Sequence, residues 1–158
     1  MISFYFCAGT SMAKSLNTFQ AELEAEGHLV VSRWHQLHNP RLEITENENI
    51  LRGRAFVDLL DIKGSAIVIA FSNKGEMAQP KASGRGGRHF ELGYAYANGL
   101  PIWLVGEPEH AFHSLVAKEF KNWTALMDEI TNPIPNRGVR GLGVLFGKEG
   151  FEGMHDGF

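Results

Sequence analysis

Residues 65–71, SAIVIAF, form a nearly continuous apolar run, and this run constrains the fold more than any other feature of the sequence. A short apolar run without charges is typical of a strand buried on both faces, as in a parallel sheet covered by helices. Similar runs at 2–7 (ISFYFC), 28–32 (HLVVS) and 100–105 (LPIWLV) predict three more strands of the same kind.

Segments with helical spacing of apolar residues lie between and after these strands. The expected helices cover residues 11–26, 50–63, 90–97 and 123–130. Residues 34–49 are polar and irregular, and residues 72–87 form a loop rich in Gly, Ser, Lys and Arg. The alternation of strands and helices predicts an α/β fold with a doubly wound, mostly parallel sheet, a flavodoxin-like or Rossmann-like three-layer sandwich.

Length and charge set the domain count and exclude some partners. With 158 residues, we expect one domain over 1–131 and a Gly- and Pro-rich tail over 132–158. The tail is either partly disordered or ordered against a neighbouring subunit. The net charge of -3 and the pI near 6.2 give no bulk attraction to nucleic-acid polymers or anionic membranes. The positive charge is local, which suits a small anionic ligand.

Cysteine usage and the first residues bear on the compartment. A single cysteine, Cys7, excludes an internal disulfide and any multi-cysteine zinc site, and its apolar surroundings predict a buried thiol. The start, MISFYFCAG, lacks the basic and long apolar regions of a signal peptide. No run has the length of a membrane span. We therefore expect a cytoplasmic protein.

The loops after the strands are the expected place for a ligand, because the crevice of an open α/β sheet lies beyond the carboxyl ends of its strands. Glu91 follows one of these loops and would lie in the first turn of a helix, where the helix dipole favours a carboxylate. It is either an ordinary surface charge or a nucleophile. Gly9 and Thr10, in the loop after the first strand, are candidate substrate contacts.

The glycine- and arginine-rich segment before Glu91 is a candidate phosphate cradle, with backbone N–H groups and arginines facing an anion. Its candidate substrate-binding residues are Ser83, Gly84, Arg85, Gly86, Gly87 and Arg88. A flexible connector is the other interpretation. The histidine pairs His35/His38 and His110/His113 lack the acids or cysteines that complete a familiar metal site, so no metal is expected.

Three stretches together resemble the nucleoside 2-deoxyribosyltransferase family, which includes the nucleoside 5′-monophosphate N-glycosidases. They are FYFCAGTSM, VDLLDIKGSAIVIAF and GGRHFELGYAYANGLPIWLVG, in register over roughly residues 2–130. ELGYA is the most specific block, and the segment PEHAFHSL with the aromatic-rich stretch after it resembles phage-type sequences of this family.

The resemblance implies a role for three side chains. Glu91, before LGYA, would attack the anomeric carbon C1′ of a deoxyribosyl or ribosyl group. Tyr5 on the first strand would orient Glu91 by a hydrogen bond, and Asp58 in DLLDIK would assist protonation of the departing base. The resemblance also implies a homo-oligomer, and this carboxylate chemistry needs no cofactor.

One departure from the family pattern concerns recognition of the base. The nucleoside transferases carry an acid a few residues before the glutamate, whereas residues 83–88 here read SGRGGR. Glycine and arginine in place of the acid would suit a 5′-phosphate. The sequence therefore predicts a deoxyribosyltransferase-like enzyme acting on a small nucleoside or nucleotide. A monophosphate N-glycosidase and a non-catalytic nucleotide-binding module are the alternatives.

Overall fold

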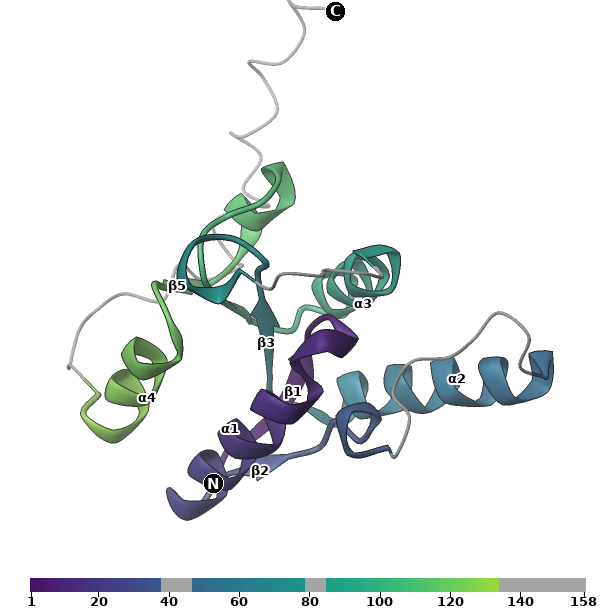
Figure 1. The fold of residues 1–158 in the computed structure, drawn as a ribbon, viewed down its shortest axis with the longest axis horizontal. Coiled ribbons are helices and arrows are strands. Elements are labelled where there is room, and N and C mark those ends of the chain that lie inside the picture. Colours follow the sequence, from purple (N-terminus) through teal and green to yellow (C-terminus); the bar gives the residue numbers. More distant parts are fainter. Residues whose placement is uncertain (38–46, 79–84, 134–158) are drawn as a thin grey trace, which may run out of the picture.

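The computed structural model describes residues 1–37, 47–78 and 85–133 (Figure 1). Parts of three predicted segments lie outside these residues: 38–46 of the polar excursion, 79–84 of the loop before Glu91, and 134–158 of the tail. Within the described part, no helix is long and apolar enough to span a bilayer.

Five strands form a single sheet in the order β2-β1-β3-β4-β5, and every neighbouring pair is parallel. The strands are β1 (Ser3–Cys7), β2 (Leu29–Val30), β3 (Ile67–Phe71), β4 (Ile102–Val105) and β5 (Lys118–Phe120). This order is the flavodoxin-like one, and its switch point lies between β1 and β3. The predicted doubly wound α/β fold is confirmed. All five residues of β3 are buried, as the run SAIVIAF predicts.

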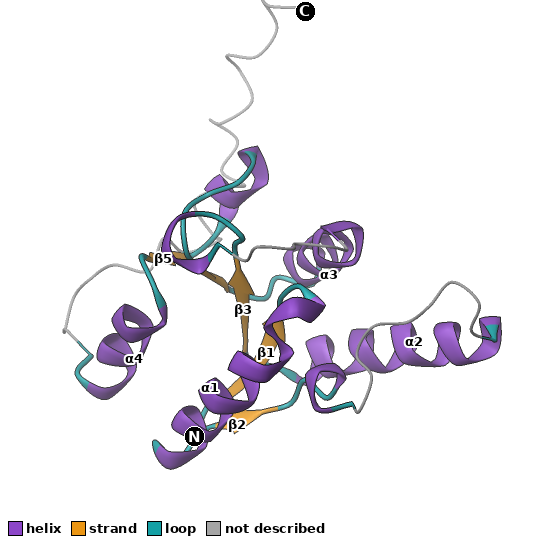
Figure 2. Cartoon of the chain, in the orientation of Figure 1, coloured by secondary structure: helices purple, strands orange, loops and turns teal. Residues whose placement is uncertain are grey.

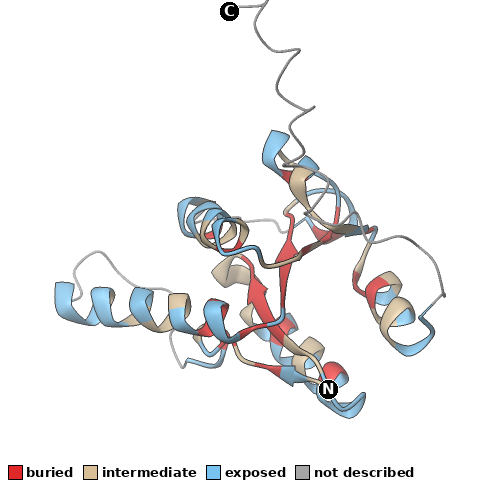
Figure 3. Ribbon diagram, turned by 180° about the vertical axis from the view of Figure 1, so that it is seen from behind, coloured by how far each residue is buried: buried red, intermediate tan, exposed pale blue. Residues whose placement is uncertain are grey.

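Helices cover both faces of the sheet, as Figures 1 and 2 show. They are α1 (Ala13–Ala25), α2 (Glu48–Gly64), α3 (Arg85–Ala97) and α4 (Trp123–Thr131). Leu16 of α1 and Leu126 of α4 belong to one buried cluster, and Ile62 of α2 and Ala95 of α3 belong to the other. The result is a three-layer sandwich with its strands at the centre, where Figure 3 shows most of the buried ribbon.

Strand β1 divides its side chains between the two clusters because successive residues of a strand point to opposite faces. Phe4 and Phe6 pack on the α1/α4 side, whereas Tyr5 and Cys7 pack on the α2/α3 side. All four are at most 1% exposed. Tyr5 and Cys7 therefore face the two helices that carry the predicted catalytic carboxyls.

Two elements differ from the sequence prediction. Helix α3 begins at Arg85, earlier than the predicted residue 90. Gly86 and Gly87 have low helix propensity and read as loop, but contacts made by Arg88 hold this first turn against β3. Strand β5 has the sequence KEF, which is too short and too charged to give the signal of a buried strand, so the prediction missed it.

Short 3₁₀ segments complete the described chain: η1 (Thr10–Met12), η2 (Trp34–Gln36), η3 (Gly75–Met77) and η4 (Ala111–Leu115). η1 follows β1, η3 follows β3 and η4 follows β4. These three segments thus lie after the carboxyl ends of adjacent strands, where the ligand crevice of such a fold is expected.

Candidate active site

The side chain of Glu91 lies between α3, β1 and α2. It interacts electrostatically with the Tyr5 hydroxyl and the Cys7 thiol of β1, and with the Asp58 carboxyl of α2. Glu91 is only partly exposed. The structure thus brings together Tyr5, Asp58 and Glu91, which are far apart in the sequence. An ordinary surface charge would face solvent instead.

Burial governs the ionisation of Glu91. It raises the pKa of Glu91 to about 7, because a carboxylate loses hydration when it leaves water. The negative charge of Asp58 raises this pKa further, whereas hydrogen-bonding interactions with Cys7 and Tyr5 and the positive charge of Arg88 lower it. Near neutral pH, Glu91 therefore exchanges between a protonated form and an ionised form that can act as a nucleophile.

Asp58 lies on the side of α2 that faces this site and is the second carboxyl of the pair. Burial, with the charge of Asp61 as the next cause, raises the pKa of Asp58 to about 6. Arg33 and Arg54 act in the opposite direction. A carboxyl with such a pKa holds a proton in mildly acidic solution and can donate it.

Asp61, one turn further along α2, has a different role. Its side chain is paired with Arg33, whose Nη2 lies 2.6 Å from Oδ1 and whose Nε lies 3.1 Å from both carboxylate oxygens. The main-chain N–H of Arg33 donates to the same carboxylate at 3.3 Å. Asp61 thus ties α2 to the segment after β2, whereas the charge of Asp58 acts on Glu91.

Tyr5 presents a neutral hydroxyl to the carboxyl pair. Burial raises its pKa, and the charges of Glu91 and Asp58 raise it further, so the phenol keeps its proton. The hydroxyl oxygen is buried and forms no hydrogen bond of ordinary geometry with a described residue. It is nevertheless close enough to Glu91 to lower the pKa of that carboxyl. Tyr5 therefore places a protonated hydroxyl beside the Glu91 carboxyl.

Cys7 is the part of this site whose place the sequence prediction missed. The thiol is 1% exposed, and its Sγ donates to the main-chain carbonyl of Arg88 at 3.5 Å. Burial raises its pKa, and Glu91 is the next cause. The sequence does contain a signal for the position of the Cys7 side chain. Cys7 follows Tyr5 by two residues, and this spacing puts both side chains on one face of β1.

The predicted cradle is only partly within the described structure. Gly9 precedes η1, and Thr10 begins it. Gly86 and Gly87 are exposed in the first turn of α3. Ser83, Gly84 and the side chain of Arg85 lie outside the described residues. The side chain of Arg88 is buried rather than open to the loop, and its Nη1 donates to the carbonyl of Phe71 at 2.7 Å.

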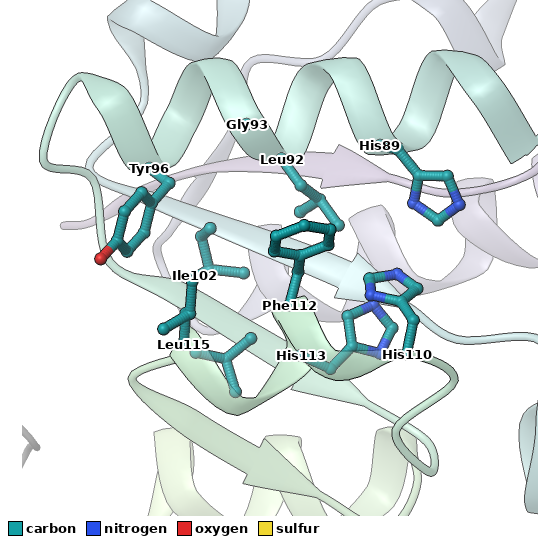
Figure 4. Close-up of a pocket in the computed structure, with 10 residues that line it drawn as sticks. His89, Leu92, Gly93, Tyr96, Ile102, His110, Phe112, His113 and Leu115 are labelled. Carbon is teal, nitrogen blue, oxygen red and sulfur yellow. The ribbon is translucent and has the colours of Figure 1, made fainter. Parts of the chain in front are cut away.

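A separate pocket of about 580 Å³ lies on the other side of α3, between that helix, β4 and η4 (Figure 4). Its walls are almost entirely apolar, with histidines at one end. The lining residues are His89, Leu92, Gly93, Tyr96, Ile102, His110, Phe112, His113, Leu115 and Val116. Neither Glu91 nor Asp58 lines it, so this pocket and the carboxyl pair occupy different sides of α3.

The predicted histidine pairs have different surroundings. His35 is buried and interacts with Asn17 at 3.0 Å and with Ser32 at 3.2 Å, so it packs and bonds within the α1 side of the sheet. His38 lies outside the described residues. The rings of His110 and His113 are 3.8 Å apart, centre to centre. In the described part of the chain, no group of three or more His, Cys, Asp or Glu side chains could hold a metal ion.

Two solved enzymes share this fold. The 2-deoxyribosyltransferase of Bacillus psychrosaccharolyticus superposes with a TM-score of 0.59 at 22% identity, covering 80% of this chain and 90% of the other. The CMP N-glycosidase BcmB of Clostridium botulinum superposes with a TM-score of 0.50 at 16% identity, covering 82% and 98%. No protein-family model and no curated protein matches the sequence. The comparisons establish the fold, and at these identities they establish nothing finer.

The raised pKa of Glu91 makes a prediction about stability. The folded protein keeps the proton of Glu91 up to about pH 7, whereas an unfolded chain releases it near pH 4.5. The contribution of Glu91 to stability is thus fully present below about pH 4.5 and is lost as the pH rises through 7. Glu91→Gln should therefore raise the free energy of unfolding at pH 8 by up to about 3 kcal/mol and leave it unchanged at pH 4.

Denaturant unfolding at both pH values measures this difference. Glu119→Gln, which changes an exposed glutamate of β5 in the same way, is the matched control and should leave both values unchanged. A Glu91→Gln protein that is no more stable than wild type at pH 8 would show that Glu91 is not held in a poorly hydrated site.

Proposed function

We propose that the chain is a member of the nucleoside 2-deoxyribosyltransferase family that breaks the N-glycosidic bond of a (deoxy)nucleoside or nucleotide. The observation that carries this proposal is the mutual interaction of Glu91, Asp58 and Tyr5 in the fold of such enzymes. These are the three residues to which the resemblance assigns catalysis. A protein that only binds its ligand has no need of a nucleophile supported in this way.

The proposed first step forms a covalent glycosyl-glutamate. A carboxylate oxygen of Glu91 bonds to C1′ of the sugar while the bond from C1′ to the base nitrogen breaks, and the bonding electrons leave with the base. Asp58 supplies the proton that the departing base needs. The nearby carboxylate also stabilises the positive charge that develops on the sugar. Tyr5 holds the attacking oxygen by donating to Glu91.

The second step decides between transfer and hydrolysis. An acceptor base or a water molecule attacks C1′ from the opposite side and releases Glu91, while Asp58 takes up the proton from the attacking group. Two successive displacements retain the configuration at C1′. Transfer is the function that we propose first, as a nucleoside 2-deoxyribosyltransferase. Hydrolysis of a nucleoside 5′-monophosphate is the alternative, and residues 83–88, which carry arginines and no acid, favour it.

A non-catalytic nucleotide-binding module is the second candidate. The absence of an acid from SGRGGR favours it, because a base-reading group of the transferases is then missing. In either case we propose a small nucleoside or nucleotide as the ligand and the cytoplasm as the location. Gly9, Thr10 and residues 83–87 remain the proposed substrate contacts.

Release of free base tests the enzyme proposal. The protein is incubated with a panel of deoxynucleosides and their 5′-monophosphates, with and without an acceptor base, and the products are separated by chromatography. We expect release that falls at least about a thousandfold in Glu91→Gln, because no nucleophile remains. Glu119→Gln should retain the wild-type rate. The rate should be greatest between about pH 6 and 7, because it needs Glu91 ionised and Asp58 protonated.

The products of this assay also distinguish the three candidate functions from one another. Release that requires an acceptor base identifies a transferase, and release without one identifies a hydrolase. Tight binding with no release identifies the binding module. Release that persists at the wild-type rate in Glu91→Gln would contradict the proposed nucleophile.

We further propose that the protein is a homo-oligomer in which a second copy covers the apolar pocket beside α3. Phe112 is 76% exposed at this pocket, so the same surface offers both a projecting side chain and a hollow. A two-fold interface requires such a self-complementary surface. None of the described residues that line the pocket is Asp, Glu, Lys or Arg, so two copies can meet there without repulsion between these charges. The tail, 132–158, is a further candidate for packing on the neighbour.

Light scattering tests the oligomer. Wild type should have at least twice the mass of one chain, and Phe112→Asp should shift the protein toward the monomer, because a charge then faces an apolar surface. Phe56→Asp is the matched control, since Phe56 is a similarly exposed aromatic residue on α2 and should leave the mass unchanged. A monomeric wild-type protein would contradict the proposal.

A further inference from the structure

Arg88 is a buried cation one helical turn before Glu91. Arginine is rarely buried without a partner, and Arg88 is only 8% exposed. Its Nη1 donates to the main-chain carbonyl of Phe71, the last residue of β3, at 2.7 Å. The same Nη1 lies 3.6 Å from Oε1 of Glu109, and each of these two side chains is 10% exposed. The guanidinium group thus joins the start of α3 to the end of β3.

Glu109 extends this connection to the segment after β4. Its carboxylate oxygen Oε1, which faces Arg88, also accepts a hydrogen bond from the main-chain N–H of Asn73, just after β3. Its own N–H donates to Nδ1 of His113 in η4 at 3.1 Å. Figure 4 shows His113 beside His110, below the first turns of α3. One carboxylate therefore bridges the loop after β3 and the arginine of α3, while its main chain is fixed to η4.

The main chain of Arg88 is held from a third direction. The thiol of Cys7, at the end of β1, donates to the carbonyl of Arg88 at 3.5 Å. The first turns of α3 are thus attached to the carboxyl ends of β1 and β3 and to the loop after β4. Glu91 follows Arg88 by three residues, so the two lie on the same side of α3, one turn apart.

The space around Arg88 argues against direct contact with a substrate phosphate. A cavity beside Arg88, Glu109 and Cys7 has a volume of about 10 Å³. A single water molecule needs about 10–15 Å³ on this scale, so a phosphate group cannot enter it. The Nε of this guanidinium is itself buried and forms no hydrogen bond with a described residue.

We propose that Arg88 and Glu109 form a positioning pair, which anchors the start of α3 to the carboxyl ends of β1, β3 and β4 and so holds the Glu91 carboxyl in its reactive place. This proposal rests on the proposed function for the reactivity of Glu91, but not for the anchoring. It replaces the substrate contact predicted for Arg88 with a role inside the protein.

The experiment compares three altered proteins with wild type. Arg88→Met combined with Glu109→Gln removes both charges, because leaving one buried charge unpaired would threaten folding. Arg88→Lys keeps the charge but loses the planar guanidinium that contacts Phe71 and Glu109. The exposed pair Arg52 and Glu48 on α2, changed to Met and Gln, is the matched control. Circular dichroism confirms folding before any other measurement.

Two readouts separate positioning from substrate contact. In the double variant, kcat for base release should fall about tenfold or more while KM changes less than about twofold. The pKa of Glu91, followed by carboxyl ¹³C NMR, should rise, because the cation that lowers it is gone while Tyr5, Cys7 and Asp58 remain. Arg88→Lys should show the fall in kcat with little change in this pKa. The control pair should change neither quantity.

A KM that rises more than about tenfold at unchanged kcat would overturn the proposal and make Arg88 a substrate contact. Unchanged kcat and KM together with an unchanged pKa of Glu91 would overturn it as well. If wild type releases no base, the proposed function fails and the NMR titration alone decides. A Glu91 pKa that does not differ between wild type and the folded double variant then refutes the pair.

Discussion

The partly buried carboxyl of Glu91, held between β1 and α2, is the feature on which the rest of the site depends. Placing an acid where water is scarce costs stability whenever the acid is ionised. The surrounding groups offset part of this cost, because the Tyr5 hydroxyl, the Cys7 thiol and the charge of Arg88 all favour the ionised form. Asp58 acts against it, and the balance puts the pKa of Glu91 at about 7.

The fold supplies this environment through simple geometry. The alternation of side chains along β1 sends Phe4 and Phe6 into one layer of core, and Tyr5 and Cys7 toward the other. The parallel connections then bring α2 and α3 to the same face of the sheet as Tyr5. The position of the carboxyl pair at the switch point between β1 and β3 is therefore a consequence of strand order. The apolar pocket lies on the other side of α3, away from the carboxyl pair, where the surface of another molecule can pack against it.

Much of the fold could be predicted because β3 and β4 are apolar runs with helical segments between them. The strand KEF could not, since an edge strand with two charged residues leaves no such pattern. The start of α3 was also missed, because its glycines favour a loop and only tertiary contacts of Arg88 favour the helix.

The resemblance and the position of each element predict that Glu91, Asp58 and Tyr5 share one site. The structure places these three side chains close enough to interact, and their catalytic roles stay a prediction. The inward direction of Arg88 and the contact of Cys7 with α3 depend on side-chain packing, which sequence spacing does not encode. The residues assigned to the cradle before Arg85 lie outside the described structure, so their role stays a prediction.

The most direct measurement is mass spectrometry of the protein quenched with acid during turnover of a deoxynucleoside or its monophosphate, followed by proteolysis. A covalent route through Glu91 predicts that the peptide containing this residue gains the mass of one sugar unit. The gain should disappear when Glu91 is replaced by glutamine. A sugar attached to any other residue, or rapid base release with no attached sugar under conditions that preserve glycosyl esters, would contradict the central claim.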